Sequence, residues 1–197
     1  MLLNPDTEVQ ADALNQLAAF LDEHPTVAAV APKLVFPDGG TQRSCRAFPS
    51  PWLLFCDAIG LARLSPKRFG AYRMHDFDHE STRPVEQPMF SAIMIRRQAW
   101  DQIGPLDERF PIFFNDVDWC MRAKQKGWET WFLAEAKVIH HHGQSTKHMG
   151  RALARESHRS LAELYKKHYR DALPWPILWT LIGIIRLSGF FRSLLPR

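Results

Sequence analysis

Cysteine is scarce in this sequence, and the spacing of the cysteines argues against both a disulfide framework and a thiolate zinc site. The chain of 197 residues contains three cysteines, Cys45, Cys56 and Cys120, with no Cys-x-x-Cys pair. An odd number of widely spaced cysteines indicates neither a disulfide framework nor a thiolate zinc site. We therefore expect a chain that works in a reducing cytosol.

Long uninterrupted hydrophobic runs are also missing. The first residues lack the charged segment and long apolar run of a secretory signal. The most apolar segment, 177–195, contains Arg186 and Arg192, whereas a spanning helix needs about 20 largely uncharged residues. We expect a tail that lies in the lipid head-group layer, with Trp175 and Trp179 at its boundary. Ordinary packing on the domain and a true span are the alternatives.

Charge of one sign is concentrated in one part of the chain. The formal charge is +4 and the pI is near 9.1, and many of the basic residues lie between Lys147 and Arg197. This asymmetry favours an acidic neighbouring surface. Because no stacking platform or base-reading motif accompanies the basic residues, we predict anionic lipid head groups and no nucleic acid as partner.

Hydrophobic periodicity predicts alternating helices and strands, which is typical of an α/β layer fold. Hydrophobic residues make up 46% of the chain, enough for one sizeable core. We predict helices over 8–23, with Asp6 or Thr7 as cap, and over 52–64, 97–103, 116–126 and 151–169. Strands are expected over 27–36, 41–46, 89–95, 131–133 and 137–139. The predicted organisation is a domain over 1–150, a linking helix over 151–173 and a membrane-associating tail over 174–197.

Three polar clusters are candidates for chemistry: residues 4–6 (Asn-Pro-Asp), 115–118 (Asn-Asp-Val-Asp) and 140–142 (His-His-His). Each also has a plain structural interpretation. Asp6 can cap the first helix, and Asp118 can pair with Arg122 four residues later. Consecutive histidines on a strand alternate in direction, so at most two point the same way.

Taken together, the clusters suggest a divalent metal site and a base. A carboxylate near residue 6 and an imidazole near residue 140 are suitable ligands that leave positions open for phosphate oxygens. A separate carboxylate at the start of a helix can accept a proton from a hydroxyl. A structural zinc site in the histidine cluster is a weaker alternative.

Several ordered motifs resemble bacterial family 2 glycosyltransferases of the rhamnosyltransferase-like kind. The most specific is GPLDERFPIFFNDVDWCMR over residues 104–122, continued by Gly127 and AKVIHH over 136–141. Shorter matching segments are 2–7, 32–34, 38–39, 42–46 and 95–97. The similarity covers Leu2 to about Tyr169, and it implies a partial GT-A fold, with a mixed sheet flanked by helices.

The resemblance implies roles for particular residues. Asp6 and His140 match the ligands of a divalent ion, Mg²⁺ or Mn²⁺, and Asn4 lies on the donor diphosphate side. Asp116 matches the catalytic base, while Asn115 stands where the family has a first acid. We further assign Asn115, Asp118, Arg109 and Glu86 to substrate or acceptor binding. Phe90-Ser91 stands where many relatives have Gly-Ala, so we expect a narrower pocket beside the donor sugar.

The resemblance also implies a reaction and its partners. An inverting transferase moves a sugar from a nucleotide-sugar donor, for which dTDP-rhamnose is our guess, to a saccharide or lipid-linked acceptor in cell-envelope polysaccharide synthesis. The expected location is peripheral, at the cytoplasmic face of the inner membrane. The nucleotide-binding amino-terminal half of the family is not in this sequence, so we expect the chain to be inactive alone. The alternative is a non-catalytic remnant or split-protein subunit that binds a membrane or a partner chain.

Overall fold

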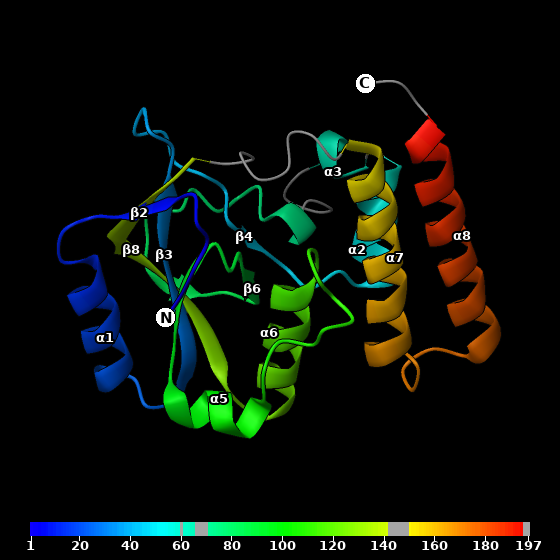
Figure 1. The fold of residues 1–197 in the computed structure, drawn as a ribbon. Coiled ribbons are helices and arrows are strands. Elements are labelled where there is room, and N and C mark those ends of the chain that lie inside the picture. Colours follow the sequence, from blue (N-terminus) through cyan, green and yellow to red (C-terminus); the bar gives the residue numbers. More distant parts are fainter. Residues whose placement is uncertain (60, 66–70, 142–149, 195–197) are drawn as a thin grey trace. The chain divides into compact units, whose positions relative to one another are not determined.

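The computed structural model describes residues 1–59, 61–65, 71–141 and 150–194, which form two compact units (Figure 1). The first unit comprises Met1–Pro105 and Trp119–His142. The second comprises Leu106–Asp118 and Gly143–Arg197. The second unit thus includes a segment, Leu106–Asp118, that the sequence pattern grouped with the preceding domain.

A mixed β-sheet is the centre of the first unit. Its strands have the order β1-β7-β3-β8-β2, and β5 also pairs with β8. Strands β3 and β8 are parallel, and the other pairs are antiparallel. The bounds are β1 Leu2–Leu3, β2 Thr7–Val9, β3 Val27–Val35, β5 Arg83–Pro84, β7 Ala92–Ile95 and β8 Glu129–His140. A separate two-stranded sheet pairs β4, Cys45–Arg46, with β6, Gln87–Pro88.

The central strands owe their position to their composition. Every residue of β3 is buried, as expected for a Val- and Ala-rich strand covered on both faces. The only charged residue in this strand, Lys33, keeps its ammonium 2.5 Å from the Glu80 carboxylate. Because β3 pairs along one edge of β8, both β2 and β5 lie on the other edge, at opposite ends of β8.

Helices pack against the sheet of the first unit. Helix α1 (Ala13–Glu23) places Leu17 and Leu21 in a core cluster with Val30 of β3. The other helices of this unit within the described residues are α2 (Pro51–Ala58), α3 (Leu61–Leu64), the 3-10 turn η1 (Ala71–Arg73) and α5 (Arg97–Ile103). The later turns of α6 (Asn115–Gln125) also belong to it. Of these helices, α1 contacts β3 and β8, and α5 contacts β3, in agreement with the predicted mixed sheet flanked by helices.

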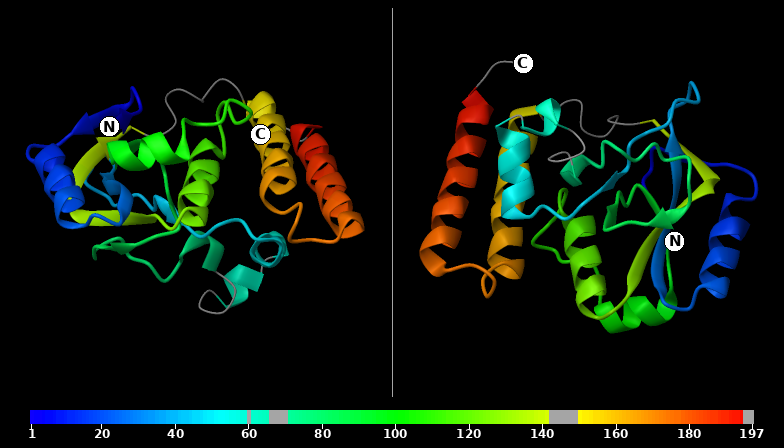
Figure 2. Two further views of the ribbon diagram at one scale, coloured as in Figure 1. Left: turned by 90° about the horizontal axis from the view of Figure 1, so that it is seen from below. Right: turned by 180° about the vertical axis from the view of Figure 1, so that it is seen from behind.

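The second unit is built on two long helices that lie side by side (Figures 1 and 2). They are α7, Gly150–His168, and α8, Trp175–Leu194. The helices approach closely at Gly189, because a Cβ added there would lie 2.5 Å from the Cβ of His158. In the part of the chain that the structure describes, no helix is long and apolar enough to cross a membrane.

Several predicted elements are confirmed. Strand β3, helix α5 and helix α7 lie within one residue of their expected bounds, and α6 begins one residue earlier than expected. Gly127, the expected end of α6, has a φ of 81°. Short helices also occupy the long segment after residue 48, as expected.

Other boundaries were wrong. The helix predicted from residue 8 begins at Ala13, and Thr7–Val9 forms β2 instead. Its cap position is Asp12, so the capping role suggested for Asp6 or Thr7 is excluded. The two short strands expected over 131–139 form one strand of 12 residues, β8. The strand expected over 41–46 is reduced to β4 and an isolated bridge at Thr41.

Candidate active site and metal centre

The structure brings Asp6 and His140 together, although they are far apart in the sequence. Strand β2 begins just after Asp6, and its first residue, Thr7, is paired with His140 at the end of β8. The backbone N–H of His141 donates to the Asp6 carbonyl at 2.9 Å. As a result, Oδ1 of Asp6 lies 3.5 Å from Nε2 of His140. This antiparallel register is what joins the first and third polar clusters.

The Asp6 carboxylate has an unusual electrostatic situation. Among the described residues, its Oδ1 is the one buried side-chain oxygen or nitrogen that has no hydrogen-bond partner. An unpaired buried carboxylate oxygen is costly unless a cation or donor compensates it. The orphaned oxygen therefore identifies a position where a positive ligand would be stabilised.

The separation of the two atoms suits a shared divalent ion. Ligand distances of about 2.1 Å place two ligand atoms about 3.0 Å apart at a right angle and about 3.4 Å apart at a tetrahedral angle. The observed 3.5 Å is close to the upper value. Within the described ranges no three His, Cys, Asp or Glu side chains gather into a metal-binding group. Asp6 and His140 would thus supply two ligands and leave the other positions to substrate oxygens or water.

Gln42 fixes the state of the His140 ring. Its Nε2 donates to the His140 carbonyl at 2.6 Å and to the Val35 carbonyl at 3.3 Å, so its Oε1 must be the atom that lies 2.9 Å from His140 Nδ1. An amide oxygen only accepts, and therefore Nδ1 carries the proton. In the neutral ring the lone pair of Nε2 faces the Asp6 side, as in metal-binding histidines that donate through the other nitrogen.

The other two histidines of the cluster have different fates. His141 turns to the surface, where its Nε2 lies 2.6 Å from the Glu8 carboxylate. The third histidine of the cluster, His142, lies outside the described residues. The alternation expected of consecutive histidines therefore separates His140 from His141, and the structural zinc site stays an unsupported alternative.

Asn4 lies at the junction of β1 and β7. Its backbone N–H donates to the Ser91 carbonyl at 2.8 Å, and its side-chain amide lies 3.4 Å from the Ser91 hydroxyl. The adjacent Phe90 packs edge-on against Trp119, with ring centroids 5.8 Å apart. The Phe90-Ser91 pair thus lies beside the segment that leads to Asp6.

Asp116 belongs to the second unit, where it lies in the first turn of helix α6. Phe114, the residue directly before α6, has a φ of 68°, a left-handed conformation that turns the chain sharply into the helix. The Asn115 side chain accepts the N–H of Asp116 at 2.7 Å, and Asp116 Oδ1 accepts the N–H of Val117 at 2.8 Å. The carboxylate is half-buried at a helix N-terminus, where the helix dipole favours its ionised form. This is the form that a general base requires.

Asp118 has quite different surroundings, because it is fully buried and paired. One of its oxygens lies 2.6 Å from the Lys167 ammonium and 2.7 Å from His168 Nε2. Lys167 also contacts Asp107 at 2.7 Å. This cluster joins the start of α6 to the end of α7. Arg122, the suggested partner of Asp118, donates to the carbonyls of Ile103 and Pro105.

Arg109 is engaged by the same cluster. Its guanidinium contacts the Asp107 carboxylate at 2.6 Å. Hydrogen bonds from Arg109, and then from Lys167, hold the pKa of Asp107 well below its usual range. The Asp107 carboxylate in turn raises the pKa of Arg109. Acceptor contact by Arg109 and Asp118 stays a prediction, and the contacts that the structure gives them hold the second unit together.

Glu86 lies far from the Asp6–His140 pair. It borders a cavity of about 460 Å³ whose lining includes Phe48 and Lys124. Glu86 accepts the Phe48 N–H at 2.8 Å and the Lys124 ammonium at 2.7 Å. Its carbonyl contacts Thr130 near the start of β8, about 30 Å along the strand from His140. The structure therefore does not bring Glu86 to the pair.

The cysteines offer no alternative nucleophile among the described residues. All three are buried and free of disulfides. Burial raises the pKa of the Cys45 thiol to about 12, so that this side chain stays protonated at neutral pH.

Comparison with known proteins gives these residues a context. Two curated N-acetylglucosaminyl-diphospho-decaprenol L-rhamnosyltransferases, from two strains of Mycobacterium tuberculosis, are 29% identical to the chain over 205 residues. The chain is related to glycosyltransferases. The match covers 100% of the chain, which spans 65% of the length of these relatives. No protein-family model matches it.

More distant relatives agree with this relationship. A low-salt glycan biosynthesis hexosyltransferase of Haloferax volcanii is 22% identical over 64% of the chain and 36% of its own length. An O-antigen biosynthesis protein of Myxococcus xanthus is 25% identical over 75% of the chain and 11% of its own length. The predicted resemblance is confirmed, and the observed mixed sheet flanked by helices is consistent with a GT-A-like fold.

Proposed function

We propose that the chain is the metal-binding and catalytic part of an inverting family 2 glycosyltransferase of cell-envelope polysaccharide synthesis. The observation that carries this proposal is the Asp6–His140 pair, with its orphaned carboxylate oxygen and its Gln42-fixed imidazole. The names of the relatives support a sugar donor and a glycan acceptor.

The donor proposed is a nucleotide sugar, with dTDP-rhamnose as the first candidate. The Mycobacterium relatives are named as rhamnosyltransferases that act on a decaprenol-linked N-acetylglucosamine. We accordingly propose a saccharide on a lipid diphosphate as acceptor. Such substrates remain at the membrane surface, which agrees with the proposed peripheral location at the cytoplasmic face of the inner membrane.

Asp6 and His140 would hold a divalent ion, Mg²⁺ or Mn²⁺. When bound there, the ion supplies positive charge beside the oxygens of a diphosphate leaving group. The protein supplies the geometry: the β2–β8 register fixes the Asp6 backbone, and Gln42 fixes the imidazole. Asn4 follows β1 on the same segment as Asp6 and contributes an amide on the diphosphate side.

The transfer itself is a single displacement. Asp116 takes the proton from the acceptor hydroxyl while the hydroxyl oxygen attacks the anomeric carbon of the donor sugar. The bond between that carbon and the diphosphate oxygen breaks, its electron pair leaves with the nucleoside diphosphate, and the configuration inverts. Because Asn115 stands where the family has a first acid, Asp116 is the one carboxylate of this pair that can take the proton.

The substitution Asp116→Asn, made in a form of this protein that has transferase activity, tests whether Asp116 is the base. Since general-base catalysis is worth about 100- to 10,000-fold, we expect turnover to fall by that range while donor binding changes little. The rate is measured as release of nucleoside diphosphate from dTDP-rhamnose with a lipid-linked N-acetylglucosamine acceptor. An exposed acid of the same unit, Glu108, provides the control Glu108→Gln. Full turnover in Asp116→Asn would show that the base is another group.

A further inference from the structure

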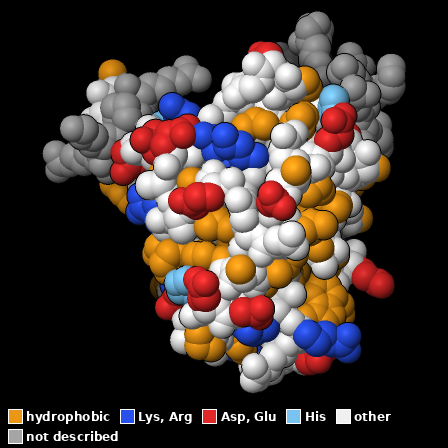
Figure 3. All heavy atoms as spheres, turned by 90° about the vertical axis from the view of Figure 1, so that its left-hand side faces the viewer, with side chains coloured by type: hydrophobic (Ala, Val, Ile, Leu, Met, Phe, Trp, Pro, Cys, Tyr) orange, Lys and Arg blue, Asp and Glu red, His pale blue; other side chains and the backbone are white. Residues whose placement is uncertain are grey.

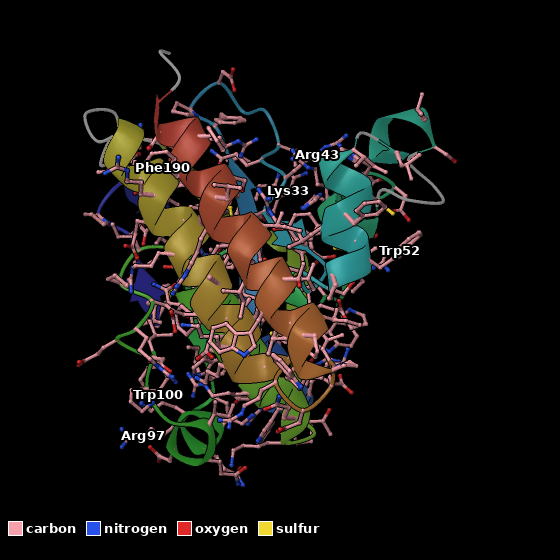
Figure 4. All side chains as sticks on the ribbon, turned by 90° about the vertical axis from the view of Figure 1, so that its right-hand side faces the viewer. Lys33, Arg43, Trp52, Arg97, Trp100 and Phe190 are labelled. Atoms are coloured by element: carbon pink, nitrogen blue, oxygen red, sulfur yellow. The ribbon has the colours of Figure 1, made fainter. Side chains whose placement is uncertain are left out.

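The outward face of α8 is hydrophobic over its whole length. At 100° per residue, the buried Leu178 and Ile182 lie on one side, directed at α7. The opposite arc, about 160° wide, carries large exposed side chains, and Phe190 is labelled on α8 in Figure 4. These residues define the α8 outer face: Ile177, Trp179, Ile184, Leu187, Phe190 and Phe191. Each is at least half exposed.

The few polar groups near this face need no water. Thr180 donates its hydroxyl to the Pro176 carbonyl at 2.7 Å, and Ser188 donates to the Ile185 carbonyl at 3.0 Å. Hydroxyls that bond back to the helix can enter an apolar medium at low cost. The irregular pattern in the sequence arises because α8 is apolar on both sides, one for α7 and one for another surface.

Cations border the α8 outer face, and α8 contains no acidic residue. Arg186 lies on one side of the arc and Arg192 on the other. Arg186 is 52% exposed and reaches Glu163 of α7 at 3.3 Å. Trp175, at the first turn of the helix, is 74% exposed. Apolar residues flanked by arginines and bordered by tryptophan are typical of helices that lie in a lipid interface.

We propose that α8 docks flat on an anionic phospholipid bilayer through its outer face, with Arg186 and Arg192 on lipid phosphates. A second copy of the chain fits less well, because α8 brings no carboxylate to pair with the arginines of its neighbour. The 20 residues of α8 span about 30 Å, which is long enough for a multi-residue contact within one leaflet. The proposal does not depend on the transfer reaction, since vesicle binding needs neither donor nor acceptor.

Vesicle co-sedimentation of the full 197-residue chain tests the proposal. We expect binding to phosphatidylglycerol–phosphatidylcholine vesicles that weakens on pure phosphatidylcholine. Binding should also weaken between about 0.1 M and about 1 M salt, where the screening length shrinks from about 10 to about 3 Å. The double variant Ile184→Glu/Leu187→Glu should bind at least about 100-fold more weakly, because two large aliphatic side chains no longer enter the lipid.

Leu14→Glu is the matched control. Leu14 is 46% exposed on α1. Charged and hydrophobic side chains are intermixed on the side of the protein that faces the viewer in Figure 3. The Leu14→Glu variant should bind vesicles as tightly as the unaltered chain. Arg192→Gln, which leaves the apolar face intact, should weaken binding by about 5-fold. Unchanged binding in the double variant would overturn the proposal. The proposal would also be overturned if the unaltered chain were a dimer in light scattering and did not bind vesicles, while the double variant was a monomer.

Discussion

Asp6 and Asp118 are two inward-facing carboxylates with opposite surroundings. Asp118, in the second unit, is fully buried and contacts both Lys167 and His168. Asp6, in the first unit, presents a buried oxygen that no donor in the described part of the chain satisfies. A buried acid that is fully paired contributes to the fold, whereas one that is left unpaired marks a place for a ligand. Both lie in motifs that the sequence alone ranked as equal candidates.

The largest expected effect separates these two acids by stability. Breaking a buried ion pair by removing one partner costs about 3–5 kcal/mol, so Asp118→Asn should lower the free energy of unfolding by about 3 kcal/mol or more. Asp6→Asn should change it by less than about 1 kcal/mol, or raise it, because a buried unpaired charge is removed. Urea denaturation followed by circular dichroism measures both.

An exposed acid calibrates this comparison. Asp101 forms a surface pair with Arg97 at 2.9 Å, and Asp101→Asn should cost only about 0.3–0.5 kcal/mol. If Asp6→Asn were as destabilising as Asp118→Asn, Asp6 would be a structural acid, and the comparison between the two would fail.

A smaller effect is expected for the residue that supports His140. Gln42→Leu removes the acceptor for Nδ1–H and the donor to two carbonyls. Altering such a supporting hydrogen bond typically costs 10- to 100-fold in metal affinity, and we expect a loss in that range for Mn²⁺, measured by titration. Gln16→Leu, at an exposed position of α1, should leave the affinity unchanged. Equal affinities would remove Gln42 from the site.

Much of the fold could be predicted, because long periodic segments carry a strong signal. The buried run of β3 and the helix between Arg97 and Gly104 are examples. The sequence predicts two strands in place of β8 because residues 134–136, Ala-Glu-Ala, have low strand propensity. In the structure these residues coincide with a shift in register against β3. Strand β2 was missed since its three residues merge into the pattern of the following helix.

The candidate site could be predicted only in part. The polar clusters and the family resemblance both point to Asp6 and His140, but the register that joins them depends on long-range pairing that periodicity does not encode. Gln42 lies in one of the segments that resemble the family, 42–46, but an isolated amide gives no local signal of its role. For Asp118, the local spacing to Arg122 suggested a helix-surface pair, whereas its partners Lys167 and His168 come from a distant helix.

The central claim is that Asp6 and His140 bind one divalent ion, and Mn²⁺ titration monitored by NMR of the histidine rings tests it most directly. Paramagnetic Mn²⁺ should broaden the His140 ring signals selectively, while those of His24, near the opposite end of the sheet, persist. In Asp6→Asn the selective broadening should disappear at the same Mn²⁺ concentration. Equal broadening of both histidines, or a His140 response that Asp6→Asn leaves intact, would contradict the account.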